Sequence, residues 1–101
     1  MRLILVNYEE YDMYNVRMAY PVEFESKEAL IAEFELQKDK GIAETKRRNP
    51  TEEYMHRHAL IELCGIPINI DSSRPYEYPE FYTVDEWFEQ CKYEYIKGEV
   101  K

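Results

Sequence analysis

Residues 2–24 read RLILVNYEEYDMYNVRMAYPVEF, and apolar or aromatic side chains alternate along most of this stretch. The alternation has the period of a β-strand, in which successive side chains point to opposite faces of a sheet. We therefore predict one strand from Arg2 to Tyr8 and a second from Met13 to Tyr20, joined by a polar turn over Glu9 to Asp12. The two form an antiparallel pair. The second strand can continue past Pro21, which lacks an N–H and marks a strand edge or break.

A helix is predicted directly after this pair. Ser26 is a favourable N-cap, and apolar residues then recur at helical spacing up to Lys40. Lys38 and Lys40 stand where the helix dipole favours positive charge. Gly41 has the left-handed preference that ends helices, and the apolar Ile42 follows it. The pattern predicts a helix that ends at Lys40.

A second helix and a third strand are expected in the middle of the chain. Pro50 disfavours helical geometry in the residue before it, so the chain breaks there. Thr51 then caps a helix that runs to Cys64 and stops at Gly65. The short apolar alternation over Ile66–Ile70 predicts a strand.

The segment from Asp71 to Tyr95 combines aromatic and acidic residues. Its first part, Asp71 to Pro79, has the proline and serine content of a turn. The next part holds a capping box, in which Thr83 and Glu86 each satisfy the other's backbone N–H. A third helix is therefore predicted over residues 84–96, and its N-terminal staple is formed by two aromatic residues, Tyr82 and Trp87. Its core-facing residues would be Val84, Trp87, Phe88, Cys91 and Tyr95, and its outward residues Asp85, Glu89 and Lys92.

The order of predicted elements, β-β-α-α-β-α, indicates a small α+β fold. We expect an antiparallel sheet of two or three strands with about three helices on one face. The length of 101 residues is near the commonest domain size, so residues 1–101 are predicted to form a single globular domain. An aromatic content of 15% argues against intrinsic disorder.

The chain is strongly acidic, with 21 Asp and Glu against 13 Lys and Arg and a net charge of −8. Nucleic acids and anionic membranes are bound through Lys and Arg, so direct binding to either is disfavoured. No apolar run approaches the ~18 residues that span a bilayer, and the apolar start of the chain is too short for a signal peptide. We expect a soluble protein of the cytoplasm.

Signatures of nucleotide binding and nucleophilic catalysis are missing. The three glycines, Gly41, Gly65 and Gly98, form no phosphate-binding loop, and no cofactor is predicted. Cys64 and Cys91 have no CxxC spacing, which favours a reducing compartment. We expect Cys64 at a helix C-terminus, where the dipole disfavours a thiolate, and both cysteines in the core. The chain is therefore predicted not to be an enzyme.

One cluster has the residue types of metal ligands, namely Glu53, His56 and His58. Glu53 and His56 have the spacing of half a carboxylate di-iron motif, but a second copy is missing. On a helix, His56 and His58 point about 200° apart and cannot share an ion. A solvated helix face is the simpler interpretation. A small metal-dependent enzyme or metal-binding domain centred on these residues remains the alternative hypothesis.

The strongest functional signal is the excess of tyrosine, ten in 101 residues, or about three times average usage. Tyrosine gives large contact area for little lost entropy and is enriched at protein interfaces. The loop over residues 74–82, stiffened by Pro75 and Pro79, displays it beside acids. The alternative is that the tyrosines cover a small core. We predict a partner-binding site formed by this loop and the outward acids of the next helix: Tyr76, Glu77, Tyr78, Glu80, Asp85, Glu86 and Glu89.

These features favour a small acidic inhibitor whose carboxylates take the place of nucleic-acid phosphates. Its predicted partner is the basic surface of a nucleic-acid-binding protein, approached with electrostatic steering. In size, charge and lack of catalytic motifs the chain resembles the inhibitors that phages make against host nucleases, including anti-CRISPR proteins. Bacterial immunity proteins against nuclease toxins share this character and are a further alternative. The likeness covers composition and size, not a motif.

Overall fold

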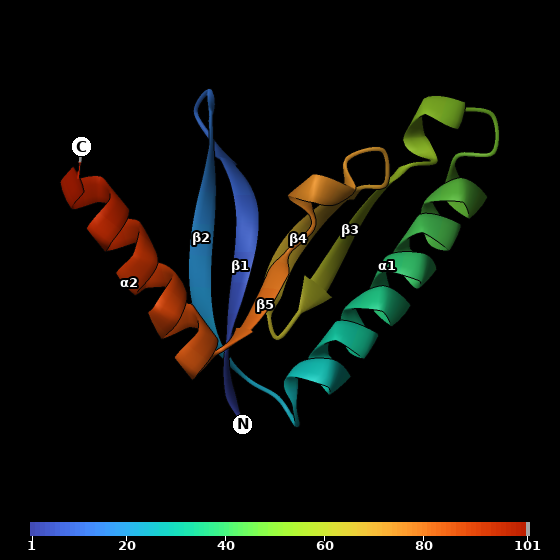
Figure 1. The fold of residues 1–101 in the computed structure, drawn as a ribbon. Helices are drawn as coiled ribbons and strands as arrows, with labels where there is room; N and C mark the ends of the chain where they lie inside the picture. Colours follow the sequence, from blue (N-terminus) through green and yellow to red (C-terminus); the bar gives the residue numbers. More distant parts are fainter. Residues whose placement is uncertain (101) are drawn as a thin grey trace.

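Two antiparallel sheets and two helices make up the chain in this computed structural model (Figure 1). The structure describes the backbone of residues 1–100 and the side chains of residues 1–10 and 12–92. The elements follow one another as β1 (Arg2–Tyr11), β2 (Tyr14–Glu23), α1 (Lys27–Arg48), η1 (Glu53–Met55), β3 (His58–Leu63), β4 (Ile66–Asp71), η2 (Pro75–Glu77), β5 (Glu80–Thr83) and α2 (Val84–Val100). The predicted α+β class is confirmed, whereas the prediction of three helices in the order β-β-α-α-β-α is wrong.

The predicted antiparallel pair is present, and both strands are longer than expected. β1 pairs with β2 from Arg2 opposite Glu23 to Tyr11 opposite Tyr14. The turn therefore contains only two residues, one of which is Asp12 with a left-handed φ of 52°. The predicted turn over residues 9–12 is wrong, because Glu9 and Glu10 continue the strand and only aspartate, asparagine and glycine accept such a φ readily.

Strand β2 lies at the edge of its sheet, where the strand order is β2-β1-β5. Pro21 is part of this strand, opposite Ile4. An edge strand tolerates proline because one row of its N–H groups has no partner in the sheet. The prediction that the second strand continues past Pro21 is confirmed.

Helix α1 begins as predicted but does not end at Gly41. The Ser26 side chain accepts a hydrogen bond from the Ala29 N–H at 3.0 Å, which is the expected N-cap. The helix then passes through Gly41 and ends at Arg48. A Cβ at Gly41 would lie 2.9 Å from Ile61 Cγ2 and 3.1 Å from Ala59 Cβ. Gly41 thus allows β3 to approach the helix closely.

The predicted helix over residues 51–64 is wrong. After the short η1 turn, β3 and β4 form a hairpin, in which Leu63 pairs with Ile66. Cys64 and Gly65 are its two turn residues, with φ angles of 52° and 78°. Alternate residues of β3 are buried, which is the period of a strand. Gly65 therefore makes a tight hairpin turn and not a helix end, whereas the predicted strand over residues 66–70 is confirmed.

The core lies between α1 and the two sheets. Leu3 and Leu5 of β1 are fully buried, as are Leu30 of α1 and Ile68 of β4. The remaining residues of this cluster are Val22, Phe34, Ala59, Ile61, Leu63 and Ile70, and Val6 of β1 is also fully buried. Asn7 is the one polar residue of the described chain buried to this degree, and its side-chain amide donates to Pro67 O at 3.4 Å. This bond joins the two sheets.

The two helices contact opposite faces of the β2-β1-β5 sheet. Phe81 of β5 packs against Phe34 of α1, with ring centroids 5.7 Å apart. The next residue, Tyr82, packs against Trp87 of α2 at 5.4 Å. Because successive side chains of a strand point to opposite faces, the prediction that all helices share one face is wrong. The strand β5 itself was expected to be part of a loop.

Helix α2 begins with the predicted capping box. The Thr83 N–H donates to Glu86 Oε1 at 2.8 Å, and the Glu86 N–H donates to Thr83 Oγ1 at 3.1 Å. The prediction that its apolar residues face the core is wrong for Val84 and Phe88, which are 38% and 73% exposed, and for Cys91, which is exposed. The side chain of Tyr95 lies outside the described residues. In the described part of the chain, the structure contains no helix whose length and apolar character would suit a bilayer.

Candidate functional site

The seven predicted site residues lie on three different elements. Tyr76, Glu77 and Tyr78 belong to η2 and the residue after it, and Glu80 begins β5. Asp85, Glu86 and Glu89 lie on α2, which is on the other side of the β1–β2 hairpin from η2 (Figure 1). The structure therefore does not gather them into one surface.

The two tyrosines of the predicted loop have different roles. Tyr76 is 72% exposed. Tyr78 is half-buried and packs edge-on against Phe34, with ring centroids 5.7 Å apart. The ammonium of Lys38 lies 5.2 Å from the centre of the Tyr78 ring. Tyr76 is thus available to a partner, whereas Tyr78 covers the core, as the alternative interpretation expected.

Two of the predicted acids already have partners in the chain. Glu80 forms an ion pair with Arg17 of β2 and accepts a hydrogen bond from the Tyr82 hydroxyl at 3.2 Å. Glu86 binds the Lys27 ammonium at 3.0 Å in addition to capping α2. The Thr83 N–H and the Lys27 ammonium lower the pKa of Glu86. A partner protein would have to compete with these contacts.

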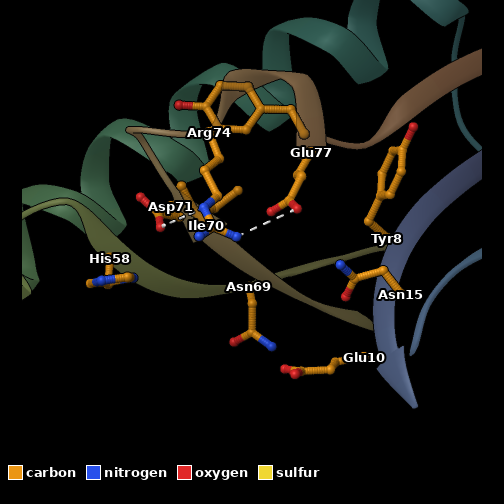
Figure 2. A pocket seen from close by; sticks show the side chains of 10 residues that line it. Tyr8, Glu10, Asn15, His58, Asn69, Ile70, Asp71, Arg74 and Glu77 are labelled. Atoms are coloured by element: carbon orange, nitrogen blue, oxygen red, sulfur yellow. Dashed lines mark ion pairs between the residues drawn. The ribbon is translucent and has the colours of Figure 1, made fainter. Parts of the chain in front are cut away.

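Residues of the hairpin and of η2 enclose a cleft of about 150 Å³, shown in Figure 2 and named here the acidic cleft. The β1–β2 hairpin forms one wall, and the end of β4 with η2 forms the other. The volume equals that of about five water molecules, so one side-chain head group fits. Its lining residues are Tyr8, Glu10, Asn15, His58, Asn69, Ile70, Asp71, Arg74, Glu77 and Tyr78.

The acidic cleft contains three carboxylates and one guanidinium. Arg74 lies 4.0 Å from Asp71 and 3.8 Å from Glu77, so both contacts are longer than hydrogen bonds. Glu10 on the opposite wall has no ion-pair partner among the described side chains. Hydrogen bonds from the Ser73 hydroxyl and then from its backbone N–H lower the pKa of Asp71, which keeps this carboxyl charged. The lining therefore carries excess negative charge.

The tip of the β1–β2 hairpin lies beyond Glu10 and Asn15, which line the acidic cleft and pair with each other. Asp12 and Met13 form its turn, and Met13 is 93% exposed. Tyr14, at the start of β2, is 73% exposed. Asp12 forms no ion pair with any side chain that the structure describes. The acids Glu9, Glu10 and Asp12 were expected in a polar turn and were only the second choice for the partner-binding site.

The histidines do not form a shared centre. His56 ends η1, and its Nε2 lies 2.7 Å from Asn49 O in a structural hydrogen bond. His58 begins β3 and lines the acidic cleft. Among the residues described, no group of three or more His, Cys, Asp or Glu side chains is suited to hold a metal ion.

The cysteines lie on the surface, so their predicted place in the core is wrong. Cys64 is in the turn between β3 and β4 and not at a helix end. Partial burial, followed by the nearby Glu33 carboxylate, raises the pKa of the Cys64 thiol. A raised thiol pKa disfavours the reactive thiolate. Cys91 is exposed on α2.

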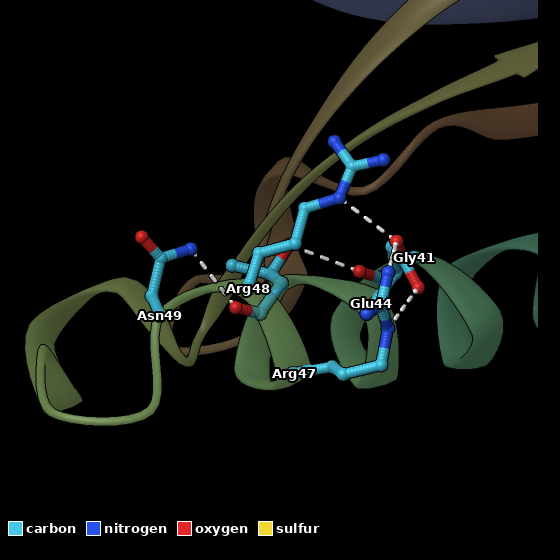
Figure 3. Close-up of polar contacts among 6 residues, drawn as sticks. Gly41, Glu44, Arg47, Arg48 and Asn49 are labelled. Atoms are coloured by element: carbon cyan, nitrogen blue, oxygen red, sulfur yellow. Dashed lines mark hydrogen bonds and ion pairs between the residues drawn. The ribbon is translucent and has the colours of Figure 1, made fainter.

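The basic residues near Pro50 lie in the last turn of α1 (Figure 3). Arg47 donates two hydrogen bonds to Glu44, at 3.1 and 2.5 Å, and Arg48 donates one at 2.8 Å. Arg47 foremost, and then Arg48, lower the pKa of Glu44 to about 2. Both guanidiniums complement the helix dipole and are partly neutralised within the helix.

No protein-family model matches the chain, and no curated protein or solved structure shows significant similarity to it.

Proposed function

We propose that the protein is a small acidic inhibitor that binds the basic surface of a nucleic-acid-handling protein. The observation that carries the proposal is the acidic cleft with its adjoining hairpin tip, where Glu10 and Asp12 lack ion pairs among the described side chains. The rings of Tyr14 on β2 and Tyr76 on η2 are exposed, and these two elements border the acidic cleft. Carboxylates beside exposed tyrosines are what a surface rich in Lys and Arg would recognise.

The acidic cleft suits an incoming arginine or lysine head group. Both side chains have long apolar stems that carry the charge into a narrow opening. Arg74 lies 3.8 Å from Glu77 and 4.0 Å from Asp71, and Asp71 also pairs with Arg57 at 3.7 Å and accepts a hydrogen bond from Ser73. Glu77 therefore keeps more lone pairs for a further donor than Asp71 does. An arginine from the partner would add charge-assisted hydrogen bonds, which are the strongest kind available at such a site.

Net charge supports rapid association. The chain carries a net charge of −8, and a basic partner would be attracted over distances of about 8 Å at physiological salt. Nucleic acid, the competing ligand of such a partner, uses the same electrostatic attraction. A protein bound over that surface would therefore exclude it. Such a protein could be a phage inhibitor of a host nuclease or an immunity protein against a nuclease toxin. The identity of the bound partner distinguishes these two classes.

Capture from a nuclease-treated bacterial lysate at low and high salt tests the proposal. The immobilised protein should capture a nucleic-acid-binding protein at low salt and release it at high salt. Glu10→Gln/Asp12→Asn/Glu77→Gln should abolish the capture. The matched control Glu25→Gln/Asp39→Asn/Glu62→Gln removes the same charge from exposed acids on other elements and should retain it. Equal capture by both triple variants would refute the assignment to the acidic cleft.

A further inference from the structure

Helix α2 presents an apolar stripe that nothing in the described chain covers. Val84 is 38% and Phe88 73% exposed, and Cys91 is exposed as well. The spacing of four and three residues places these side chains on one side of the helix. The first turn of α2 is held by the packing of Trp87 against Tyr82 and by the Glu86 ion pair. Figure 1 shows the helix leading away from the hairpin.

Two exposed acids border this stripe. Asp85 and Glu89 are exposed, are four residues apart and lie one position after Val84 and Phe88 respectively. Neither carboxylate forms an ion pair with a described side chain, in contrast to Glu86, which binds Lys27. Residues four apart lie one above the other on a helix, so the acids form a continuous edge.

We propose that α2 docks a basic amphipathic helix of a partner protein. The apolar face of that helix would bury Phe88 and Val84, and its flanking lysines or arginines would pair with Asp85 and Glu89. This is helix-against-helix recognition through anchors one turn apart. The contact goes beyond the proposed function, because it lies on a different element from the acidic cleft and is largely apolar.

Charge favours a basic partner helix over a second copy of this chain at the apolar stripe. Two copies would each bring a net charge of −8 to the contact. Like charges at such a contact oppose association, whereas a basic helix gains from the same charge.

Trp87 gives the test a direct readout, because it is the only tryptophan in the chain and lies next to Phe88. The probe is a synthetic amphipathic peptide of leucine and lysine, titrated into the full-length protein. We expect saturable binding with a blue shift of Trp87 emission. Phe88→Ser should weaken binding at least about tenfold, since burial of a phenylalanine contributes that much or more. Asp85→Asn/Glu89→Gln should weaken it and reduce its dependence on salt.

The matched control is Tyr54→Ser, because Tyr54 is 65% exposed and lies on η1, outside both the acidic cleft and α2. Titration of this variant with the peptide should shift the Trp87 emission as in the wild type. Three results would overturn the proposal: equal binding of a serine–lysine peptide of the same charge, unchanged binding by a folded Phe88→Ser variant, or dimerisation that depends on Phe88 in sedimentation. Because Trp87 lies on α2 and not in the acidic cleft, its emission reports this contact, and failure here is distinct from failure of the proposed function.

Discussion

Gly41 of α1 and Ile61 of β3 approach so closely that a methyl group on Gly41 would lie 2.9 Å from Ile61 Cγ2. Ile61 is 6% exposed and belongs to the core. A glycine inside a 22-residue helix costs stability relative to alanine, by about 1 kcal/mol. Its presence here is explained by the packing of β3 against the helix, which a larger residue would disturb.

Replacement of Gly41 by alanine should destabilise the fold. Overpacking costs about 1–3 kcal/mol and outweighs the gain of about 1 kcal/mol in helix propensity. Urea unfolding measures the difference, and the exposed Lys40→Ala should change little. Ile61→Ala removes the clashing methyl, so the double variant should lose less stability than the sum of the single variants. A Gly41→Ala protein more stable than the wild type would show that the helix does not lie this close.

Glu44 should titrate far below an ordinary glutamate. Its pKa of about 2 lies below its usual value of 4.5, because Arg47 and Arg48 donate hydrogen bonds to its charged form. A depressed carboxyl pKa stabilises the folded state above pH 4.5, and this contribution is lost as the pH falls toward 2. NMR titration of the side-chain carboxyl carbons measures the pKa. Arg47→Ala should raise it more than Arg48→Ala, and an unchanged pKa in both variants would contradict the assignment.

The Thr83 hydroxyl should contribute measurably to the start of α2. It accepts a hydrogen bond from the Glu86 N–H at 3.1 Å. Thr83→Ala should cost about 1 kcal/mol in the free energy of unfolding, the usual value for loss of an N-cap. Thr83→Ser keeps the hydroxyl and should cost less. If urea unfolding finds the alanine and serine variants equally stable, the cap contributes nothing.

The sequence predicted the first residue of both helices well, because an N-cap depends only on residues within one helical turn. Ser26 caps α1 and Thr83 caps α2, as their side chains predict. Contacts between distant segments were not predictable in this way. Gly41 has the properties of a helix stop, yet the helix continues because β3 packs against it at that point. Apolar residues over 55–64 fit a helix as well as a strand, and the pairing of β3 with β4 decides between them.

The candidate site was predictable only in part, for the same reason. The sequence predicts Tyr76 and Glu77 as loop residues that a partner can reach. Tyr76 is exposed, and Glu77 lines the acidic cleft. It does not show that Glu10 faces them, because that arrangement depends on how the hairpin packs beside β4. It also does not show that Glu80 is paired with Arg17 across the sheet.

Competition with nucleic acid is the most direct test of the proposed function. The captured partner is first bound to a short labelled nucleic acid. The acidic protein is then added, and the fraction of nucleic acid that stays bound to the partner is measured. The wild type should displace the nucleic acid, Glu10→Gln/Asp12→Asn/Glu77→Gln should fail to do so, and Glu25→Gln/Asp39→Asn/Glu62→Gln should displace it like the wild type. A partner that holds the wild-type protein and nucleic acid at the same time would contradict the account.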